Sequence, residues 1–249
     1  MSDVLVVLFG LGVGISVGLT GVGGGSFLTP FLVIALRIHP AVAVATSLVF
    51  TLVTRAVGSV QHIRQGSVDL RVVRQVAIGS IPAAIVTWAL LSRFVDGTGA
   101  SDALRARLIQ ACLVLAACVL TYRLFVPAKP GHGDNDPVKL ALLGVIVGTM
   151  VAVSSVGSGS VAVAGLVGLT SLPMARVVGT DMVHALVLAA VATPLALLHT
   201  PFDSHLALFL LIGSIPGVVV GSRLAVLVPE RFTRLTVTVA VWTLALKVA

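Results

Sequence analysis

The stretch Thr20-Gly21-Val22-Gly23-Gly24-Gly25-Ser26 interrupts an apolar run that extends from residue 4 to residue 36. A straight helix of that length would reach about 50 Å at 1.5 Å per residue, well beyond the roughly 30 Å hydrocarbon core of a bilayer. Glycine lets the backbone leave the helical region at little cost. The stretch therefore predicts two part-helices that meet at a turn within a membrane, instead of one straight span.

A second break lies at the matched position of the other half of the chain, where Ser154-Ser155-Val156-Gly157-Ser158-Gly159-Ser160 interrupts the run from 138 to 172. The two halves align without gaps over most of their length when Gly14 is placed on Gly148, and we call this the repeat alignment. It matches Val22-Gly23 with Val156-Gly157, Gly25-Ser26 with Gly159-Ser160, Thr46 with Thr180, Asp69 with Asp203, and Gly79-Ser80-Ile81-Pro82 with Gly213-Ser214-Ile215-Pro216. Four identical residues in register, a proline among them, predict an internal duplication.

The composition indicates that the natural solvent of the chain is lipid. Of its 249 residues, 57% are apolar and only 10% are charged, whereas an average globular chain carries about 25% charged residues. The long apolar runs predict an all-α integral membrane protein. They cover residues 4–36, 41–61, 72–92, 104–126, 138–172, 175–198, 206–228 and 232–248.

One hydrophilic stretch, residues 127–137, is dense in proline, glycine and charge and lies near the middle of the chain. It is typical of a linker between halves. We therefore expect a first repeat over residues 1–126, made of a broken helix at 4–36 and three spans. The polar linker at 127–137 follows, and a second repeat over 138–249 contains a broken helix at 138–172 and three spans.

The distribution of lysine and arginine predicts that the two repeats are inverted. If all eight runs cross the membrane, the two sides hold seven and eight basic residues; if both broken runs are re-entrant, they hold ten and five. The positive-inside rule favours the re-entrant arrangement. A re-entrant hairpin followed by three spans makes an odd number of crossings, so the repeats point in opposite directions. The loop from Arg64 to Arg74 carries three arginines, and its counterpart at 200–206 carries none, as this arrangement requires.

Several classes of function are excluded. The net charge of +7 comes from basic residues that stand singly between apolar runs, without the basic face that nucleic acid requires. Cys112 and Cys118 lie six apart within one run, which suits neither a disulfide nor a metal site. Catalytic and nucleotide-binding motifs are missing. We therefore expect no nucleic-acid partner, no enzyme activity, no cofactor and no bound metal.

The two breaks are candidate anion sites. Part-helices that begin inside a membrane present unpaired backbone N–H groups and the positive end of a helix dipole, and both attract anions. Ser26, Ser158 and Ser160 add hydroxyl donors beside them. The alternative is that the glycines only allow helices to pack closely. The glycines concerned are Gly23, Gly24, Gly25, Gly157 and Gly159.

A few polar residues lie within the other runs. Arg55 and Asp181 are candidates because an unpaired charge in a membrane costs several kcal/mol, and His184 lies on the helical face of Asp181, three residues on. The alternatives are snorkelling to the interface for Arg55, a capping or structural hydrogen bond for Asp181, and a satisfied buried histidine. Thr46-Ser47 occupy the repeat positions of Thr180-Asp181, and we expect the hydroxyls of Thr46, Ser47 and Thr180 to help bind the anion.

Two prolines stand at matched positions within helical runs. Pro82 and Pro216 each remove a backbone hydrogen bond and predict a kink. Such kinks serve as hinges or as static bends that shape a cavity, and the sequence leaves both interpretations open.

These residues resemble the TauE/SafE family of sulfite and organosulfonate exporters. The resemblance covers nearly the whole chain. It rests on Gly21-Val22-Gly23-Gly24-Gly25-Ser26 followed by Pro30, on Ala45-Thr46-Ser47-Leu48, and on Val178-Gly179-Thr180-Asp181-Met182. It implies a two-repeat secondary carrier in a prokaryotic inner membrane that moves small sulfur-containing anions such as sulfite, sulfoacetate or thiosulfate. The second break departs from the family pattern, because it reads Gly157-Ser158-Gly159 and Ala164 stands where the first half has Pro30.

We therefore expect a carrier in which both breaks meet near the bilayer midplane and hold a small anion between them. Membrane lipid is the expected surrounding, and the chain is expected as a monomer or homodimer. Arg55 would add positive potential, and Asp181 with His184 would couple protons or gate the site. The alternatives are a passive channel for a small solute, a membrane-embedded enzyme and a scaffolding subunit.

Overall fold

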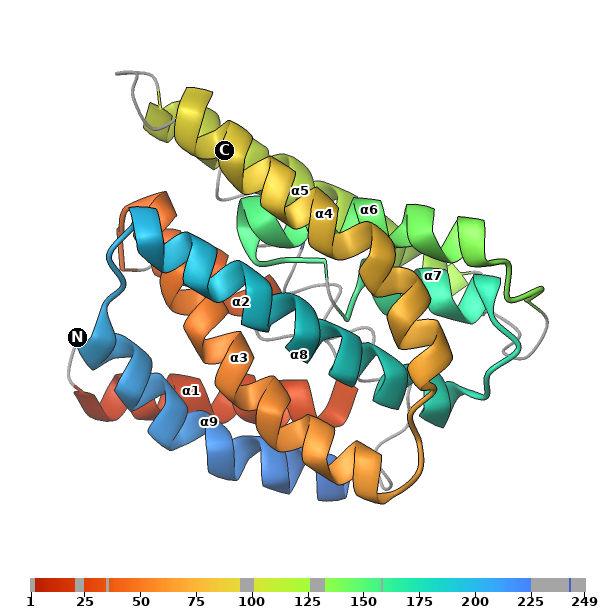
Figure 1. Cartoon of the computed structure of the whole chain (residues 1–249). Helices are drawn as coiled ribbons and strands as arrows, with labels where there is room; N and C mark the ends of the chain where they lie inside the picture. Colours follow the sequence, from red (N-terminus) through yellow and green to blue (C-terminus); the bar gives the residue numbers. More distant parts are fainter. Residues whose placement is uncertain are drawn as a thin grey trace.

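The computed structural model describes residues 3–20, 25–34, 36–94, 101–125, 133–157, 159–224 and 242, and every regular element within these ranges is an α-helix. The helices are α1 (Asp3–Thr20), α2 (Gly25–Ile34), α3 (Pro40–Arg64), α4 (Leu70–Phe94), α5 (Ser101–Phe125), α6 (Pro137–Ser154), α7 (Val161–Leu169), α8 (Met174–His199) and α9 (Ser204–Leu224) (Figure 1). Five of them, α3, α4, α6, α8 and α9, are long and apolar enough to cross a membrane. The expectation of an all-α membrane protein is confirmed.

Both long apolar runs divide where the glycine-rich stretches predict. The first run becomes α1 and α2, and the run from 138 to 172 becomes α6 and α7. The first part of each run has 18 residues, or about 27 Å of helix, whereas α2 has 10 residues and α7 has 9. The second parts reach only about 15 Å, half the thickness of a hydrocarbon core.

The chain reverses direction at each break. Phe9 on α1 stacks on Phe31 on α2, with ring centroids 3.5 Å apart. At the matched positions of the second half, Gly165 on α7 lies against the side chain of Leu143 on α6. Each contact joins a residue well before the break to one shortly after it, so both runs fold back on themselves.

Each half of the chain packs its first helix against a helix of the other half. Helix α1 packs along α9, and α6 packs along α4, so each pair takes one helix from each half (Figure 1). A Cβ atom added at Gly14 would overlap the backbone of Ser214, and one added at Gly148 would overlap the backbone of Ser80. These contacts match under the repeat alignment, which relates the halves by a pseudo-twofold. Small residues allow this close approach of backbones.

Helices α3 and α8, which correspond under the repeat alignment, run antiparallel to each other. The N–H of Asp69, beyond the end of α3, donates to the hydroxyl of Thr180 near the start of α8 at 3.0 Å. The N–H of Asp203, beyond the end of α8, donates to the hydroxyl of Thr46 near the start of α3 at 3.2 Å. This antiparallel arrangement is the one expected of inverted repeats, and the inverted repeats themselves stay a prediction.

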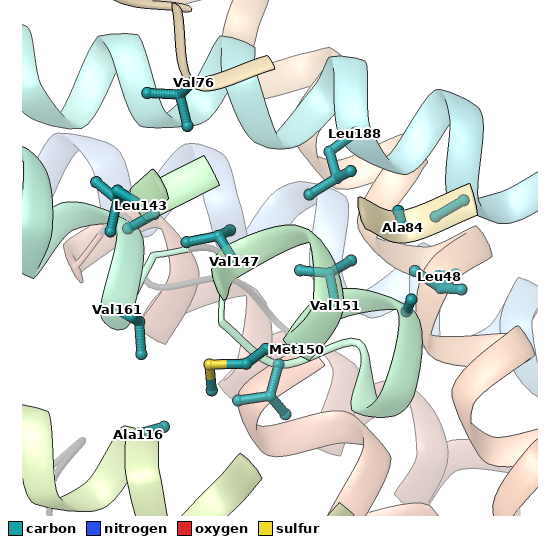
Figure 2. Close-up of a cluster of buried hydrophobic side chains, with 14 of the residues drawn as sticks. Leu48, Val76, Ala84, Ala116, Leu143, Val147, Met150, Val151, Val161 and Leu188 are labelled. Atoms are coloured by element: carbon teal, nitrogen blue, oxygen red, sulfur yellow. The ribbon is translucent and has the colours of Figure 1, made fainter. Parts of the chain in front are cut away.

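Apolar side chains fill the interior and also cover much of the outside. The larger core includes Leu143, Val147 and Val151 of α6, which lie near Val161 of α7 and Leu188 of α8 (Figure 2). A smaller core joins α1, α2, α3 and α9. Large apolar residues remain exposed on several helices, as expected of a surface in contact with lipid tails; they include Ile78, Ile85, Ile146 and Ile212.

Two expected segments lie mainly outside the described residues. Of the run 232–248 the structure describes Trp242, whose indole N–H donates to the Thr121 hydroxyl at 2.8 Å. Of the linker it describes the part from residue 133 onward, where the N–H of Gly133 donates to the Thr170 carbonyl at 3.1 Å. The end of the linker therefore packs against the end of α7.

Candidate functional site

A buried ion pair joins the two halves at the interface of α3 and α8. The Arg55 guanidinium Nη1 donates to Asp181 Oδ2 at 3.4 Å and lies 3.1 Å from the Met182 sulfur. Both charged side chains are only 1% exposed. Arg55 therefore does not snorkel to an interface. Burial of two charges is expensive unless they compensate each other, and here each half of the chain supplies one of them.

His184 finds its partner on a third helix. Its Nε2 lies 2.9 Å from the hydroxyl of Ser80 on α4, and both residues are buried. The structure thus pairs Asp181 with Arg55 and His184 with Ser80, whereas the sequence suggested a pair between Asp181 and His184. Three-residue spacing places the two side chains on one helical face, but neighbouring helices supply their hydrogen-bond partners.

Around this ion pair the site contains buried polar atoms without hydrogen-bond partners among the described residues. Such atoms are uncommon in folded proteins, because leaving a buried donor or acceptor unsatisfied costs about 1–3 kcal/mol. Their concentration on α3, on α8 and at the second break therefore marks a candidate binding site. They include Arg55 Nε and Nη2, Asp181 Oδ1, His184 Nδ1 and the hydroxyls of Ser47, Thr51, Ser155 and Ser160.

The second break lies beside the ion pair. Helix α6 ends at Ser154, and the capping residue Ser155 has a left-handed backbone with a φ of 58°. Gly157 and Gly159 follow with φ values of 124° and 89°, a region that side chains strongly disfavour. The backbone amide of Gly159 interacts with the Asp181 carboxylate. The turn of the second break therefore reaches the charge pair at Gly159, and the buried Ser160 hydroxyl follows next in the chain.

The first break is described only from α2 onward. Gly23, Gly24 and Ser158 lie outside the described residues. Gly25 and Ser26 open α2, and the Ser26 side chain lies outside the described part. The prediction that the two breaks meet across a bound anion therefore stays a prediction.

The other predicted residues have structural roles or lie apart from the ion pair. The hydroxyls of Thr46 and Thr180 accept the N–H groups of Asp203 and Asp69, as described above. Pro82 and Pro216 lie on exposed faces of α4 and α9, and both helices continue through them. Their neighbours in the repeated tetrapeptide, Ser80 and Ser214, face the interior.

Sequence reasoning missed three buried hydroxyl residues of this region. Thr51 lies on α3 between Ser47 and Arg55. Ser59 donates to the Met182 carbonyl at 3.2 Å, and Ser80 bonds to His184. The available signal was the four-residue spacing of the polar positions on α3, which places them on one ridge of the helix. In the part of the chain described here, no group of three or more His, Cys, Asp or Glu side chains could hold a metal ion.

Membrane-length helices enclose a buried ion pair whose remaining polar atoms lack hydrogen-bond partners. This arrangement is typical of a multi-pass membrane transport protein. Comparison with known proteins agrees. The family model described as "Sulfite exporter TauE/SafE" matches residues 6–248, and the chain belongs to this family.

Two relatives from Bacillus subtilis (strain 168) match over nearly the whole chain. The "Probable membrane transporter protein YjnA" is 37% identical over 230 residues, which cover 90% of each chain. The "Probable membrane transporter protein YdhB" is 25% identical over 233 residues, which cover 91% of each chain. No solved structure matches this protein. The family and these names identify a membrane transporter and not an enzyme.

Proposed function

We propose that the protein is a secondary transporter of small sulfur-containing anions, such as sulfite, sulfoacetate or thiosulfate, in a prokaryotic inner membrane. The family description supports the substrate class. The observation that carries the site is the buried Arg55–Asp181 pair, which has free polar atoms on both partners. A guanidinium with two unused nitrogens at the centre of an apolar bundle suits an oxyanion, because charged hydrogen bonds to oxygen are among the strongest in proteins.

In this proposal the anion lies between the two glycine-rich breaks near the midplane. Backbone N–H groups of residues 23–26 and 157–160 bind its oxygens, together with the hydroxyls of Ser47 and Ser160. Arg55 supplies the positive charge. The antiparallel relation of α3 and α8 supports inverted repeats, which place such a site at the repeat interface.

Asp181 is the element that couples or gates transport. A fixed carboxylate opposes an anion beside it, so it must be neutralised or displaced when the anion binds Arg55. Protonation of Asp181, with His184 nearby on the same helix, would release the guanidinium for the substrate. Asp181→Asn and His184→Ala are therefore expected to alter the dependence of uptake on pH between pH 5 and 8, a window set by the ordinary histidine pKa of about 6.5. Unchanged profiles in both variants would exclude this coupling.

The substrate and the site are tested together in proteoliposomes. We expect saturable uptake of radiolabelled sulfite, with competition by sulfoacetate and thiosulfate and weaker uptake in a Ser160→Ala variant. Thr54→Val is the control, because the Thr54 hydroxyl already bonds to the Phe50 carbonyl of its own helix at 2.9 Å. Uptake no faster than in empty vesicles would contradict the substrate class. Counterflow separates a carrier from a passive channel, the alternative that paired re-entrant segments also suit.

A further inference from the structure

Four buried polar residues follow one ridge of α3. Ser47, Thr51, Arg55 and Ser59 stand four residues apart, with exposed fractions of 0%, 4%, 0% and 1%. Residues at this spacing form a continuous ridge on a helix surface. We call these four residues the α3 polar ridge. It extends over about 18 Å of helix, more than half of a roughly 30 Å hydrocarbon core.

The α3 polar ridge faces α8. Arg55 contacts Asp181, and Ser59 donates to the carbonyl of Met182, so one end of the ridge meets the start of α8. Under the repeat alignment Thr51 corresponds to Ala185. Helices α3 and α8 run antiparallel, and Arg55 meets Asp181. Thr51 stands four residues before Arg55, and Ala185 stands four residues after Asp181. These two matched residues therefore lie at the centre of the pseudo-twofold. Ala185 is small and buried.

Two hydroxyls of the ridge differ from the hydroxyls of Thr54 and Thr121, which also lie in apolar helices. Thr54 donates to the Phe50 carbonyl at 2.9 Å, and Thr121 donates to the Ala117 carbonyl at 2.8 Å. This bond to the carbonyl four residues earlier is open to any Ser or Thr in a helix. Ser47 and Thr51 do not make it, and their oxygens have no partner among the described residues. Two hydroxyls that forgo a bond available within their own helix point to a ligand outside it.

We propose that the α3 polar ridge lines the route of the anion between α3 and α8, and that the Thr51 hydroxyl donates a hydrogen bond to it midway. The ligand class is a small oxyanion, since the ridge offers the two unbonded hydroxyls of Ser47 and Thr51 and one guanidinium. This inference rests on the proposed function and adds Thr51 as a substrate-contacting residue at a position that neither break contains.

The first test compares two isosteric changes on neighbouring residues of α3. Thr51→Val removes the free hydroxyl, and Thr54→Val removes one that is already bonded to its own helix. For sulfoacetate uptake into proteoliposomes we expect the KM of Thr51→Val to rise about five- to tenfold, the effect of one lost hydrogen bond. The KM of Thr54→Val should stay within about twofold. Equal KM values in the two variants would overturn the role of Thr51.

A second test needs no transport and separates this inference from the proposed function. Thr51→Cys and Thr54→Cys are placed in a Cys112→Ala/Cys118→Ala background and treated in membranes with an anionic, membrane-impermeant methanethiosulfonate. We expect the cysteine at position 51 to react faster than that at position 54, and sulfoacetate to protect it. A position 51 that is no more reactive than position 54 would overturn the route, even if the wild type transports sulfite. Reaction at position 51 without protection by sulfoacetate would overturn the proposed ligand.

Discussion

The helices of the two halves are held by the same contacts, whereas the centre of the molecule is built from different residues in each half. The approach of Gly14 to Ser214 recurs as that of Gly148 to Ser80. The bond from Asp203 to Thr46 recurs as the bond from Asp69 to Thr180. The packing contacts thus match across the two halves as the repeat alignment predicts.

At the centre the repeat alignment pairs unlike residues. Arg55 corresponds to Ala189, Asp181 to Ser47, and His184 to Phe50. Charge is therefore confined to one side of the pseudo-twofold, where α3 ends and α8 begins. A symmetric centre would bury two ion pairs, and each carries a large desolvation cost. In the proposed function the frame serves stability and the asymmetric centre serves transport.

The largest effect is expected from removing one charge of the ion pair. Arg55→Ala leaves Asp181 buried without its partner and should lower the free energy of unfolding by about 3–5 kcal/mol. The double change Arg55→Ala/Asp181→Ser copies the matched residues Ala189 and Ser47 and should cost much less. Thermal unfolding of the purified proteins in detergent measures both. A double variant as unstable as the single one would contradict the assignment of this pair.

The next effect concerns the frame and should be equal in the two halves. Gly14→Ala and Gly148→Ala each place a methyl group against the backbone of a neighbouring helix and should destabilise the protein by about 1–3 kcal/mol. Gly12→Ala is the control, because a Cβ atom there meets nothing within 4 Å. Melting curves of the three variants measure these losses of stability. A loss at only one of the two matched glycines would mean that the frame is not symmetric.

A smaller effect should separate the two serines of the repeated tetrapeptide. Ser80→Ala leaves the His184 imidazole without its partner and should cost about 1–2 kcal/mol. In the other half Phe50 stands at the repeat position of His184 and offers no hydrogen bond. The Ser214 hydroxyl instead donates to the Leu211 carbonyl at 3.4 Å. Ser214→Ala should therefore cost less than about 0.5 kcal/mol. Denaturation in detergent measures the free energy of unfolding of both variants. Equal losses of stability would contradict the Ser80–His184 hydrogen bond.

The smallest effect is expected at the two matched bonds near the starts of α3 and α8. Thr46→Val and Thr180→Val each remove the acceptor of one loop N–H and should each cost about 1 kcal/mol. Because the two bonds join different ends of the helix pair, their losses should add in the double variant. Unfolding free energies of the two single variants and the double variant test this. A strongly non-additive double variant would show that the two ends are coupled.

Much of the fold follows from the sequence. The apolar runs have membrane length, and glycine clusters at 20–26 and 154–160 mark the places where the two longest runs break. The sequence does not predict that α1 packs on α9 and α6 on α4, because an apolar run carries no signal for the helix it will contact. The close helix contacts at Gly14 and Gly148 were not predicted, and only the structure shows to which helices these glycines pack.

The site was predictable only in part. Charge within an apolar run singled out Arg55 and Asp181, because such residues are costly in lipid. Their pairing depends on the antiparallel register of α3 and α8, which helical periodicity alone does not contain. Periodicity suggested His184 as the partner of Asp181. The tertiary packing instead places Ser80 beside His184. Thr51 escaped notice because threonine is common in apolar helices, and its free hydroxyl is visible only once its surroundings are known.

The most direct measurement compares wild-type protein with the Arg55→Ala/Asp181→Ser variant, which makes the centre match across the pseudo-twofold. Both are reconstituted in proteoliposomes, with melting curves recorded on the same preparations, and uptake and counterflow of radiolabelled sulfite are followed. We predict saturable uptake by the wild type and none above empty vesicles for the folded variant. A folded variant that transports sulfite as the wild type does would contradict the claim that the asymmetric charged centre carries transport.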